Sequence, residues 1–413
     1  MLFDVNKVLF WFGIAVVAYA YLGYGLLLYI LVHVKRWWGI TVTRPAPLIN
    51  TEQWPKVTFI VCAYNESDWI ADKVTNSLAL RYPPELIRFV FVTDGSNDDT
   101  ELRTRTAFQV AHARSVWNVL HQPERRGKIA AFHRALQLYQ NWEGCPPEQH
   151  IIVSTDANTH LNPEAVERMV AHFQNPQIAA VAGEKRIKMG DKDAANSAGE
   201  GIYWRYESLL KKWDAELWSV VGAAGELFAF RAGLYEAVPS DTIVEDFYMT
   251  MRMAQKGHRV AYEPAAYAVE TSSATVAEEM KRKIRIAAGG LQAVVRLAPL
   301  LNLFRYKTLS FQYISHRVLR WTLAPLFLPV ILICNAILAT QGPLFYQVTL
   351  LVQIAFYTLA LLGYLFERRQ LKIKAFFIPY YFCLMNYAMY AGFFRLLRGQ
   401  QSVLWEKSKR SEE

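Results

Sequence analysis

The sequence predicts an α/β protein in which a soluble domain with a mostly parallel sheet is flanked by membrane-spanning helices. The chain has 413 residues, of which 53% are hydrophobic and 20% charged. Its mean hydropathy of +0.08 is high for a soluble enzyme and low for a protein made only of membrane helices. Uncharged segments lie near both ends, and strand-like runs alternate with helical patterns between them. The low charge and 14% aromatic content exclude a mainly disordered chain.

Four uncharged segments are long enough to cross a bilayer, which takes about 20 apolar residues. They are residues 8–34, 321–340, 344–366 and 375–394. The first is too long for a signal-peptide core and lacks a small-residue cleavage site after it, so we expect a retained anchor. The last has basic residues on both sides, so it either crosses the membrane or dips in and returns. Four buried core helices are the alternative, which these lengths disfavour.

The distribution of cations predicts the orientation in the membrane. Lys35, Arg36 and Arg44 follow the first segment, and a basic loop, Glu367–Lys374, precedes the last. The positive-inside rule then places the central domain in the cytoplasm of a multi-pass inner (plasma) membrane protein. Anionic lipid accounts for the net charge of +9, so we do not expect a nucleic-acid partner or a scaffold. The spans also lack the buried charges that transporters use.

Residues 276–320 mix apolar positions at helical spacing with several cations. This pattern predicts helices that lie along the membrane surface or, alternatively, pack on their own domain. The expected organisation is therefore an anchor (1–44), a soluble domain (45–275), amphipathic interface helices (276–320), membrane helices (321–397) and a basic tail (398–413).

The soluble domain reads as alternating strands and helices. The expected strands are 56–63, 88–93, 116–120 and 150–155, and the expected helices are 67–80, 99–113 and 128–140. Lys56–Ala63 is a continuous apolar run, typical of a strand buried on both faces. This order predicts a parallel sheet, and ligands of such sheets bind at the carboxyl ends of the strands. The loops that begin at Tyr64, Asp94 and Asp156 should therefore share one edge.

Polar motifs occupy these loops and recur later in the chain. They are Tyr64-Asn65-Glu66, Asp94-Gly95, Arg125-Arg126-Gly127-Lys128, Asp156-Ala157-Asn158, Glu245-Asp246 and Arg282-Lys283-Ile284-Arg285. The ordered set, from about Val57 to Gly290, resembles the family 2 glycosyltransferases, and among them the membrane-embedded synthases of cellulose, hyaluronan and poly-N-acetylglucosamine. The resemblance implies a Rossmann-like GT-A fold and inverting transfer of a hexose or N-acetylhexosamine from a UDP-sugar.

The resemblance implies that the first loops bind the nucleotide. Asp94 would accept a hydrogen bond from uracil, the Tyr64-Asn65-Glu66 motif would line the base and ribose, and Lys128 would face phosphate or base. Each motif also has an ordinary structural interpretation. Asp-Gly is a common turn pair, Asn65 or Ser67 suits a helix N-cap, and a lysine is usually solvated.

Asp156 and Asn158 match the ends of the family's D-x-D motif, which implies a bound Mg²⁺ or Mn²⁺. A departing diphosphate gathers negative charge, and a hard cation with oxygen ligands offsets it. Asn158 is a departure, because many members of the family carry a second aspartate there. The alternative for Asp156 is an ordinary turn residue at a strand end.

Glu245-Asp246 match the family's Glu-Asp pair, which implies that Asp246 is the general base that deprotonates the acceptor hydroxyl. Thr242-Ile243-Val244-Glu245 also reads as a capping box for a helix through Ala254, in which case Glu245 would hold that helix. The small residues of 222–225, ending at Gly225, fall where the family's acceptor-side loop is expected.

Arg282 and Arg285 are three residues apart, so they share a helix face and suit a diphosphate. They align with the family's Q-x-x-R-W motif, and lipid headgroups are the rival partner. Ile286 replaces the motif's tryptophan, which usually helps to hold the acceptor. The expected acceptor is a growing polysaccharide; the alternative is one transfer to a lipid.

The remaining expectations concern aromatic residues and partners. Trp204, Trp213 and Trp218 either stack on sugar rings or lie in the core. The implied partners are the UDP-sugar, a polysaccharide or lipid-linked acceptor and membrane lipids, with export or accessory subunits as further candidates.

Overall fold

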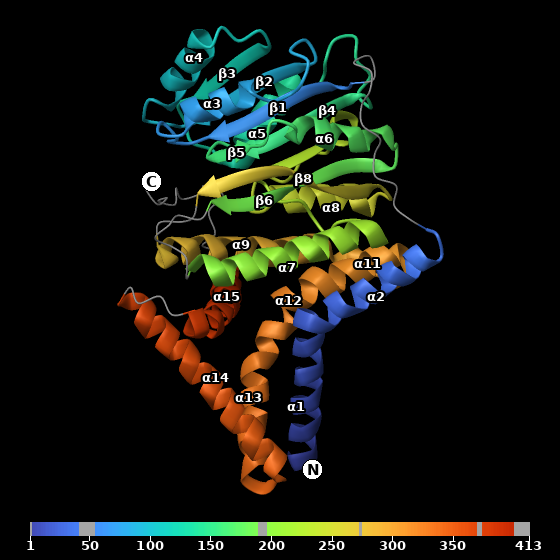
Figure 1. The fold of residues 1–413 in the computed structure, drawn as a ribbon, viewed down its shortest axis with the longest axis vertical. Helices are drawn as coiled ribbons and strands as arrows, with labels where there is room; N and C mark the ends of the chain where they lie inside the picture. Colours follow the sequence, from blue (N-terminus) through green and yellow to red (C-terminus); the bar gives the residue numbers. More distant parts are fainter. Residues whose placement is uncertain (1, 41–53, 189–195, 272–274, 370–373, 400–413) are drawn as a thin grey trace.

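The structure is a computed structural model that describes residues 2–40, 54–188, 196–271, 275–369 and 374–399. One eight-stranded sheet occupies one end of the elongated molecule, and helices α1, α13 and α14 extend from the other end (Figure 1). Helices α7 and α9 lie beneath the sheet and separate it from these three (Figure 1). The predicted tail (residues 400–413) and Arg44 lie outside the described residues.

The first half of the sheet is parallel, as the sequence predicts. Strand β1 pairs with β2 and β4, and β2 pairs with β3, all in parallel. The elements are β1 (Lys56–Ala63), α3 (Ile70–Leu78), β2 (Ile87–Asp94), α4 (Thr100–Val110), β3 (Val116–Gln122), α5 (Lys128–Tyr139) and β4 (His150–Asp156). Strand β1 is buried along nearly its whole length because helices cover both faces of the sheet.

The second half of the sheet is mixed. The strand order is β3-β2-β1-β4-β7-β6-β8-β5, and β7 runs antiparallel to both of its neighbours, β4 and β6. The elements are β5 (Thr159–Leu161), α6 (Ala165–Ala171), η3 (His172–Gln174), β6 (Ile178–Lys188), α7 (Asn196–Leu217), β7 (Leu227–Arg231), η4 (Ala232–Leu234), α8 (Glu245–Gln255) and β8 (Arg259–Thr271). The loop before β7 therefore returns to the carboxyl end of β4.

Helix α9 (Val276–Arg296) lies between the soluble domain and α15 (Lys374–Leu397), so it packs on its own domain on one side. Its predicted position along a membrane surface stays a prediction. Its small residues from Ala287 to Ala293 are largely buried. A Cβ at Gly289 would lie 2.9 Å from Val244 Cγ1, and one at Gly392 would lie 2.8 Å from Ala287 Cβ. The elements that follow α9 are η5 (Ala298–Leu301), α10 (Leu303–Tyr306), α11 (Thr308–Tyr313), η6 (Ile314–Val318) and α12 (Leu319–Trp321).

Three helical segments in the described residues are long and apolar enough to cross a membrane. They are residues 3–37, which comprise α1 (Leu2–Ala18), η1 (Tyr19–Gly23) and α2 (Tyr24–Trp37), together with α13 (Leu323–Gln341) and α14 (Leu344–Arg368). The first segment bends at η1, so that α2 runs beneath α7 and α11 while α1 continues beside α13 (Figure 1). Helix α15 (Lys374–Leu397) is not among the three and packs against α9.

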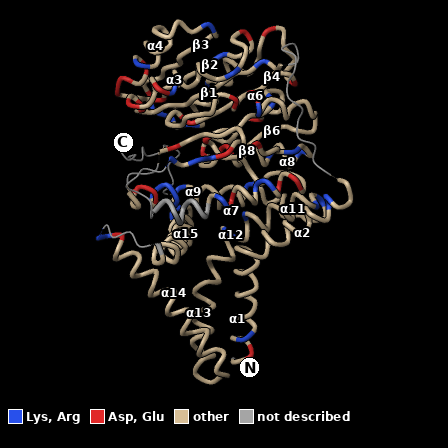
Figure 2. Tube along the Cα trace, viewed as in Figure 1, with Lys and Arg blue, Asp and Glu red and all other residues tan. Residues whose placement is uncertain are grey.

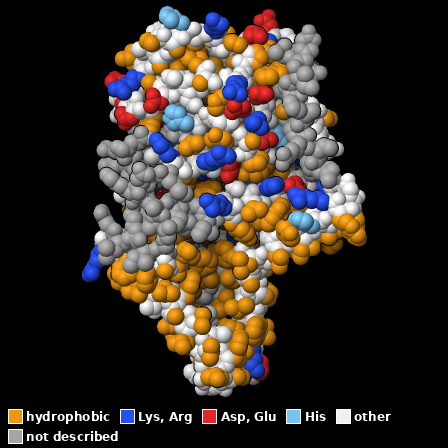
Figure 3. Space-filling view, viewed as in Figure 1, with side chains coloured by type: hydrophobic (Ala, Val, Ile, Leu, Met, Phe, Trp, Pro, Cys, Tyr) orange, Lys and Arg blue, Asp and Glu red, His pale blue; other side chains and the backbone are white. Residues whose placement is uncertain are grey.

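The surface divides along the same axis. Charged residues cover the sheet end, whereas α1, α13 and α14 are almost uncharged (Figure 2). Hydrophobic side chains cover the helical end (Figure 3), and Leu26 and Leu351 are 63% and 68% exposed there. An apolar surface of this extent marks an interaction with a membrane or another protein. Together with the three long apolar helices, it identifies a membrane protein.

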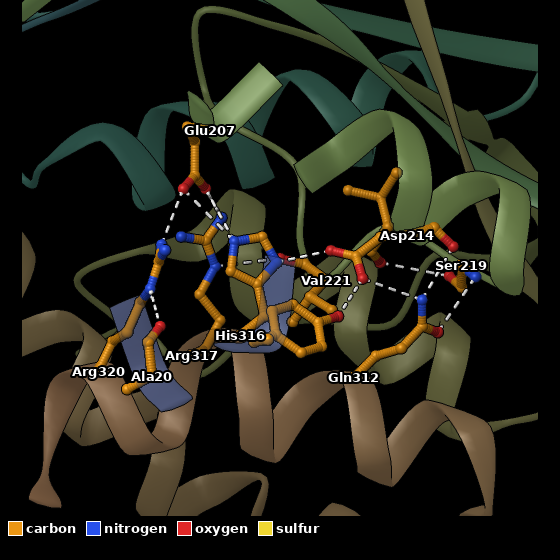
Figure 4. Close-up of polar contacts among 11 residues, drawn as sticks. Ala20, Glu207, Asp214, Ser219, Val221, Gln312, His316, Arg317 and Arg320 are labelled. Carbon is orange, nitrogen blue, oxygen red and sulfur yellow. Dashed lines mark hydrogen bonds and ion pairs between the residues drawn. The ribbon is translucent and has the colours of Figure 1, made fainter. Parts of the chain in front are cut away.

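A buried ionic cluster joins the soluble domain to the membrane side (Figure 4). Glu207 of α7 forms an ion pair with Arg317 Nη2 at 2.6 Å and accepts a hydrogen bond from Arg320 Nη1 at 3.3 Å. Asp214, seven residues or about two turns further along the same face of α7, lies 2.6 Å from His316 Nδ1. Arg320 Nε also donates to the carbonyl of Ala20, at 3.0 Å. Burial acts to raise the pKa of Glu207. The positive charges around it, that of Arg317 most strongly, nevertheless hold this pKa well below its ordinary value.

We predict that Glu207→Gln destabilises the protein by roughly 3–5 kcal/mol, because it leaves buried arginines without their counter-charge. Thermal unfolding in detergent measures the change. The matched control is Glu216→Gln. Glu216 lies on α7, like Glu207, but its ion pair with Arg36 of α2 is more exposed, so the substitution should cost at most about 1 kcal/mol. Equal midpoints for the two variants would contradict the prediction.

Candidate active site

Three loops meet at the carboxyl edge of the parallel strands, as predicted. Cys62 of β1 pairs with Asp156 of β4, and Ala63 pairs with Thr93 of β2. The residues that follow these strands therefore lie along one edge. Helix α5 begins at the same edge, because β3 runs parallel to β2 and ends there, with Gln122 beside Asp94.

Asp94 organises the loop that leads into α5. It is fully buried, and its carboxylate accepts from the backbone N–H of Gly127 at 2.6 Å and of Arg126 at 3.1 Å. Gly127 has a φ of +94°, a conformation that favours glycine. Asp94 thus sets where Lys128 enters the site. The predicted contact of Asp94 with a base stays a prediction beside this observed role.

Tyr64, Asn65 and Glu66 face the loop after β2. The Arg125 guanidinium lies 3.7 Å from the centroid of the Tyr64 ring. The Asn65 side chain accepts from the backbone N–H of Asn97 at 3.0 Å, and the Glu66 N–H donates to Thr100 Oγ1 at 2.8 Å. Their predicted contact with a nucleoside stays a prediction. The N-cap interpretation of Asn65 or Ser67 is wrong, because Trp69 is the N-cap of α3 and has no side-chain cap bond.

Lys128 lies at the centre of the site. Its Nζ is 2.8 Å from Asp156 Oδ1 at the end of β4 and 3.1 Å from Glu245 Oε1 at the start of α8. Its side chain is 24% exposed, so the solvated-surface interpretation is wrong. Burial opposes the ammonium charge, but the carboxylates of Asp156, Glu245 and Asp246 together raise the pKa of Lys128 well above its ordinary value.

Asp246 lies beside this ion pair. Burial, and then the Glu245 carboxylate, raise the pKa of Asp246 to about 7, against the opposing effect of Lys128. The backbone of Gly225 lies close to the Asp246 carboxylate and the Lys128 ammonium. A Cβ at position 225 would be 3.3 Å from Asp246 Oδ2 and 3.1 Å from Lys128 Nζ. A side chain at position 225 would therefore crowd these atoms.

The predicted capping box is wrong. The N-cap of α8 is Val244, with no side-chain cap bond, and Thr242 Oγ1 instead accepts from Arg296 Nη1 at 2.7 Å. Glu245 instead pairs with Lys128, which the fold brings to it from α5. Its place beside Asp246 makes it part of the charge environment of the site.

Arg282 belongs to a buried tetrad of charges. Its guanidinium contacts Glu226 at 3.0 Å and Glu270 at 3.5 Å, and Lys185 contacts the same two carboxylates. Despite burial, Lys185 and then Arg282 lower the pKa of Glu226 to about 2. Arg285 differs, because burial lowers its pKa while the charges of Glu245, Asp156 and Asp246 oppose the shift. The charge of Arg285 thus interacts with the carboxylates of Asp156, Glu245 and Asp246, whereas Arg282 is paired with Glu226 and Glu270.

Sequence reasoning missed three charged residues behind the site: Lys73, Lys185 and Glu270. Lys73 is 1% exposed, and its Nζ donates to Thr155 Oγ1 at 3.1 Å and to the Thr159 carbonyl at 2.8 Å. Burial lowers its pKa to about 7. The available signal was a charge placed on an otherwise apolar helix or strand face, since buried charges need partners.

Of the three tryptophans, Trp204 lies nearest the site. It lies between Lys185 and Lys283, whose Nζ atoms are 5.3 and 5.5 Å from its ring centroid. Trp213 packs edge-on against Tyr29 of α2, and Trp218 lies beneath Arg259. The core interpretation therefore fits Trp213.

The residues around Asp156 fit a divalent cation that is shared with a ligand. Among the described residues, no three His, Cys, Asp or Glu side chains form a metal cage. Asp156 and Asn158 offer a carboxylate and an amide oxygen in the half-buried turn between β4 and β5. The Lys128 ammonium already shows that the site stabilises positive charge. Mg²⁺-type ions are usually held by one or two carboxylates together with substrate phosphates.

Comparison with known proteins shows which family this chain is similar to. The family model described as "Glycosyltransferase like family 2" matches residues 55–289. Poly-beta-1,6-N-acetyl-D-glucosamine synthase of Staphylococcus aureus (strain MSSA476) is 26% identical over 257 residues, which cover 60% of this chain and 58% of the relative. The Staphylococcus epidermidis synthase is 23% identical over 58% of this chain and 56% of its own length. The chain thus spans less than two thirds of the length of these curated relatives.

A solved structure confirms the fold along nearly the whole chain. The mannosyltransferase of Pyrobaculum calidifontis, in complex with GDP-Man and Mn²⁺, superimposes with a TM-score of 0.71 at 23% identity, covering 95% of this chain and 99% of its own. The predicted GT-A-like architecture with apolar helices at both ends is confirmed. Because the family model spans more than half of the 413 residues, this protein belongs to glycosyltransferase family 2.

Proposed function

We propose that this protein transfers a sugar, with inversion, from a UDP-sugar to a growing polysaccharide at the membrane. The observation that carries the proposal is the convergence of Asp156, Lys128 and Asp246 at the carboxyl edge of the sheet. The names of the curated relatives support an N-acetylhexosamine as the transferred sugar. The expected reaction is a single displacement, so it needs no covalent enzyme intermediate.

Asp246 is the proposed general base. A sugar hydroxyl is a weak nucleophile at neutral pH, and a carboxylate within reach removes its proton as the new bond forms. A base with a pKa near 7 is well matched to this task, because it is ionised at the working pH and still accepts a proton. Because Gly225 has no side chain, no Cβ crowds the carboxylate on the side from which the acceptor hydroxyl is proposed to approach.

Lys128, Arg285 and the Asp156–Asn158 turn are the proposed diphosphate side of the site. Asp156 and Asn158 would hold a Mg²⁺ or Mn²⁺ ion, which would neutralise charge on the leaving diphosphate. Lys128 and Arg285 add fixed positive charge next to the same group. Asp94, Tyr64, Asn65 and Glu66 are the proposed nucleoside side. Arg282 pairs with Glu226 and Glu270, and its predicted contact with the diphosphate stays a prediction.

A single transfer to a lipid acceptor is the second candidate, and Ile286 favours it. The tryptophan of the family's motif is absent at this position, so the acceptor lacks one usual contact. The length of the product separates the two candidates. Purified full-length enzyme is incubated with a panel of nucleotide sugars, GDP-mannose among them, and product mass and linkage are read out. A product with one added sugar would reject the polysaccharide proposal.

We also propose that the sheet faces the cytoplasm. Lys35 and Arg36 lie in the last turn of α2, and Arg368 ends α14. These ends of α2 and α14 are nearer the sheet than the N-terminal end of α1 (Figure 1). The positive-inside rule places these ends in the cytoplasm. The division into an anchor, a catalytic domain, interface helices and membrane helices is retained as part of this proposal.

We predict that Asp246→Asn binds the donor but transfers sugar at least roughly 10²-fold more slowly, because the amide cannot accept the proton. Initial rates of UDP release and titration of UDP binding measure the two effects. Normal turnover in this variant would remove Asp246 from its proposed role. Asp241→Asn is the matched control, because Asp241 pairs with Arg296 at the surface.

We predict that kcat/KM falls about tenfold per pH unit below about pH 7. The ionised carboxylate is the active form of a base, and the pKa of Asp246 is about 7, so activity is lost as the pH falls through this value. Glu245→Gln should move the acid limb to lower pH, because Glu245 helps to raise that pKa. A limb that stays in place in this variant would contradict the assignment.

We predict that Asp156→Ala abolishes the increase in UDP affinity that Mn²⁺ or Mg²⁺ produces. The substitution removes the charged oxygen ligand that the turn offers the cation. Calorimetric titrations of UDP with and without the metal measure the difference. Glu164→Ala, which removes a partly exposed carboxylate that pairs with Arg81, is the control and should behave like the parent. The same metal effect in Asp156→Ala and the parent would exclude Asp156 as a ligand.

A further inference from the structure

A column of two aromatic rings lies between two glycines behind the catalytic helix. Phe247 directly follows Asp246, and its ring packs edge-on against the Trp321 indole, with centroids 5.2 Å apart. A Cβ at Gly222 would lie 2.0 Å from Phe247 Cδ2, and a Cβ at Gly290 would lie 3.0 Å from Trp321 Cε3. Both glycines thus let a ring approach the backbone at close range.

The column connects the parts of the site that the reaction needs. Gly222 opens the loop that ends at Gly225, and its φ of +83° favours glycine. Gly290 lies on α9, the helix that carries Arg285. Successive residues of a helix point about 100° apart, so fixing the Phe247 ring fixes the rotation of α8 and the direction of Asp246.

Trp321 reaches this column from the membrane side. It is the last residue of α12, and α13 begins two residues later, after the non-helical Thr322. The Arg317 guanidinium lies 5.8 Å from the Trp321 ring centroid and pairs with Glu207 in the buried cluster of Figure 4. Arg317 Nε also approaches the carbonyl of Val221, at 3.5 Å, immediately before Gly222.

Trp321 of α12 lies against α9 close to the motif position that Ile286 occupies. Ile286 and Gly290 are four residues apart and therefore lie on one face of α9. The indole lies against that face one turn beyond Ile286. A tryptophan is thus present next to this part of α9, but a different segment of the chain supplies it.

We infer that Trp321 is a positioning residue for the transfer reaction, which holds Asp246 in its working orientation through Phe247. This inference rests on the proposed function, because it assigns Asp246 the role of base. Trp321 has no direct contact with Asp246 among the described interactions, so its effect passes through the ring of Phe247. Through this contact, the orientation of Asp246 depends on the segment that joins the soluble domain to α13.

The test compares Trp321→Leu with Trp321→Phe in the purified full chain. Trp321→Leu should lower kcat by roughly 10- to 100-fold, because a misplaced catalytic group costs rate without weakening donor binding. The KM for the donor should stay close to the parent value, and Trp321→Phe should restore most of kcat. Hydrogen exchange over residues 245–255, measured without substrate, should be faster in Trp321→Leu than in the parent.

The matched control is Phe311→Leu. Phe311 is also a partly buried ring on the membrane-side segment, but it contacts Tyr24 of α2, with centroids 5.9 Å apart. Its loss should leave exchange in α8 and kcat near the parent values. If Trp321→Leu does not fold, Gly290→Ala serves instead, because its methyl group pushes the indole and should lower kcat in the same direction by a smaller factor.

Two outcomes would overturn the inference. One is unchanged exchange over residues 245–255 in Trp321→Leu, and the other is a kcat for Trp321→Leu equal to that of Phe311→Leu. The exchange measurement needs no substrate, so it tests the positioning role even if the proposed donor or reaction is wrong. Loss of the proposed function would appear separately, as absence of transfer by the parent protein with every donor in the panel.

Discussion

The ion pairs that Lys128 makes with Asp156 and Glu245 hold the site together, and much of the surrounding structure serves to place them. Three carboxylates, at the end of β4 and the start of α8, would repel one another at this half-buried site. One ammonium group offsets this repulsion and joins α5, β4 and α8. Asp94 in turn holds the loop from which Lys128 projects, through backbone N–H groups. The sheet edge alone would not bring these elements to one point.

The same solution to charge burial recurs at two other places, one on strands β6 and β8 and one between α7 and the membrane side. Lys185 and Arg282 neutralise Glu226 and Glu270, and Arg317 and Arg320 neutralise Glu207. Replacing such groups by apolar residues is often neutral or stabilising, so their contribution is better understood as fixing which elements meet. The first group joins α9 to β6, β8 and the acceptor-side loop. The second joins α7 to the segment that enters the membrane.

The sequence predicted the features that depend on local pattern. A continuous apolar run such as Lys56–Ala63 has one stable place in an α/β protein, so β1 and its parallel neighbours were predictable. Strand β7 was not, because its antiparallel direction depends on a long return through α7. The capping box failed for a related reason. Glu245 has a local partner in the sequence, but Lys128, more than a hundred residues away, offers a stronger, charged one.

The bent path of the N-terminal helix relates the membrane to the chemistry. Because the chain turns at η1, α2 packs along α7, while Ala20 within the bend gives its carbonyl to Arg320. A π-helical turn frees backbone groups for such contacts and is frequent at functional sites. The second π-turn, η6, carries His316 and Arg317 into the same cluster. Two irregular turns thus meet where the membrane helices join the domain. Regular helices there would leave these carbonyl and cationic groups pointing elsewhere, and the geometry behind α8 would lose its support.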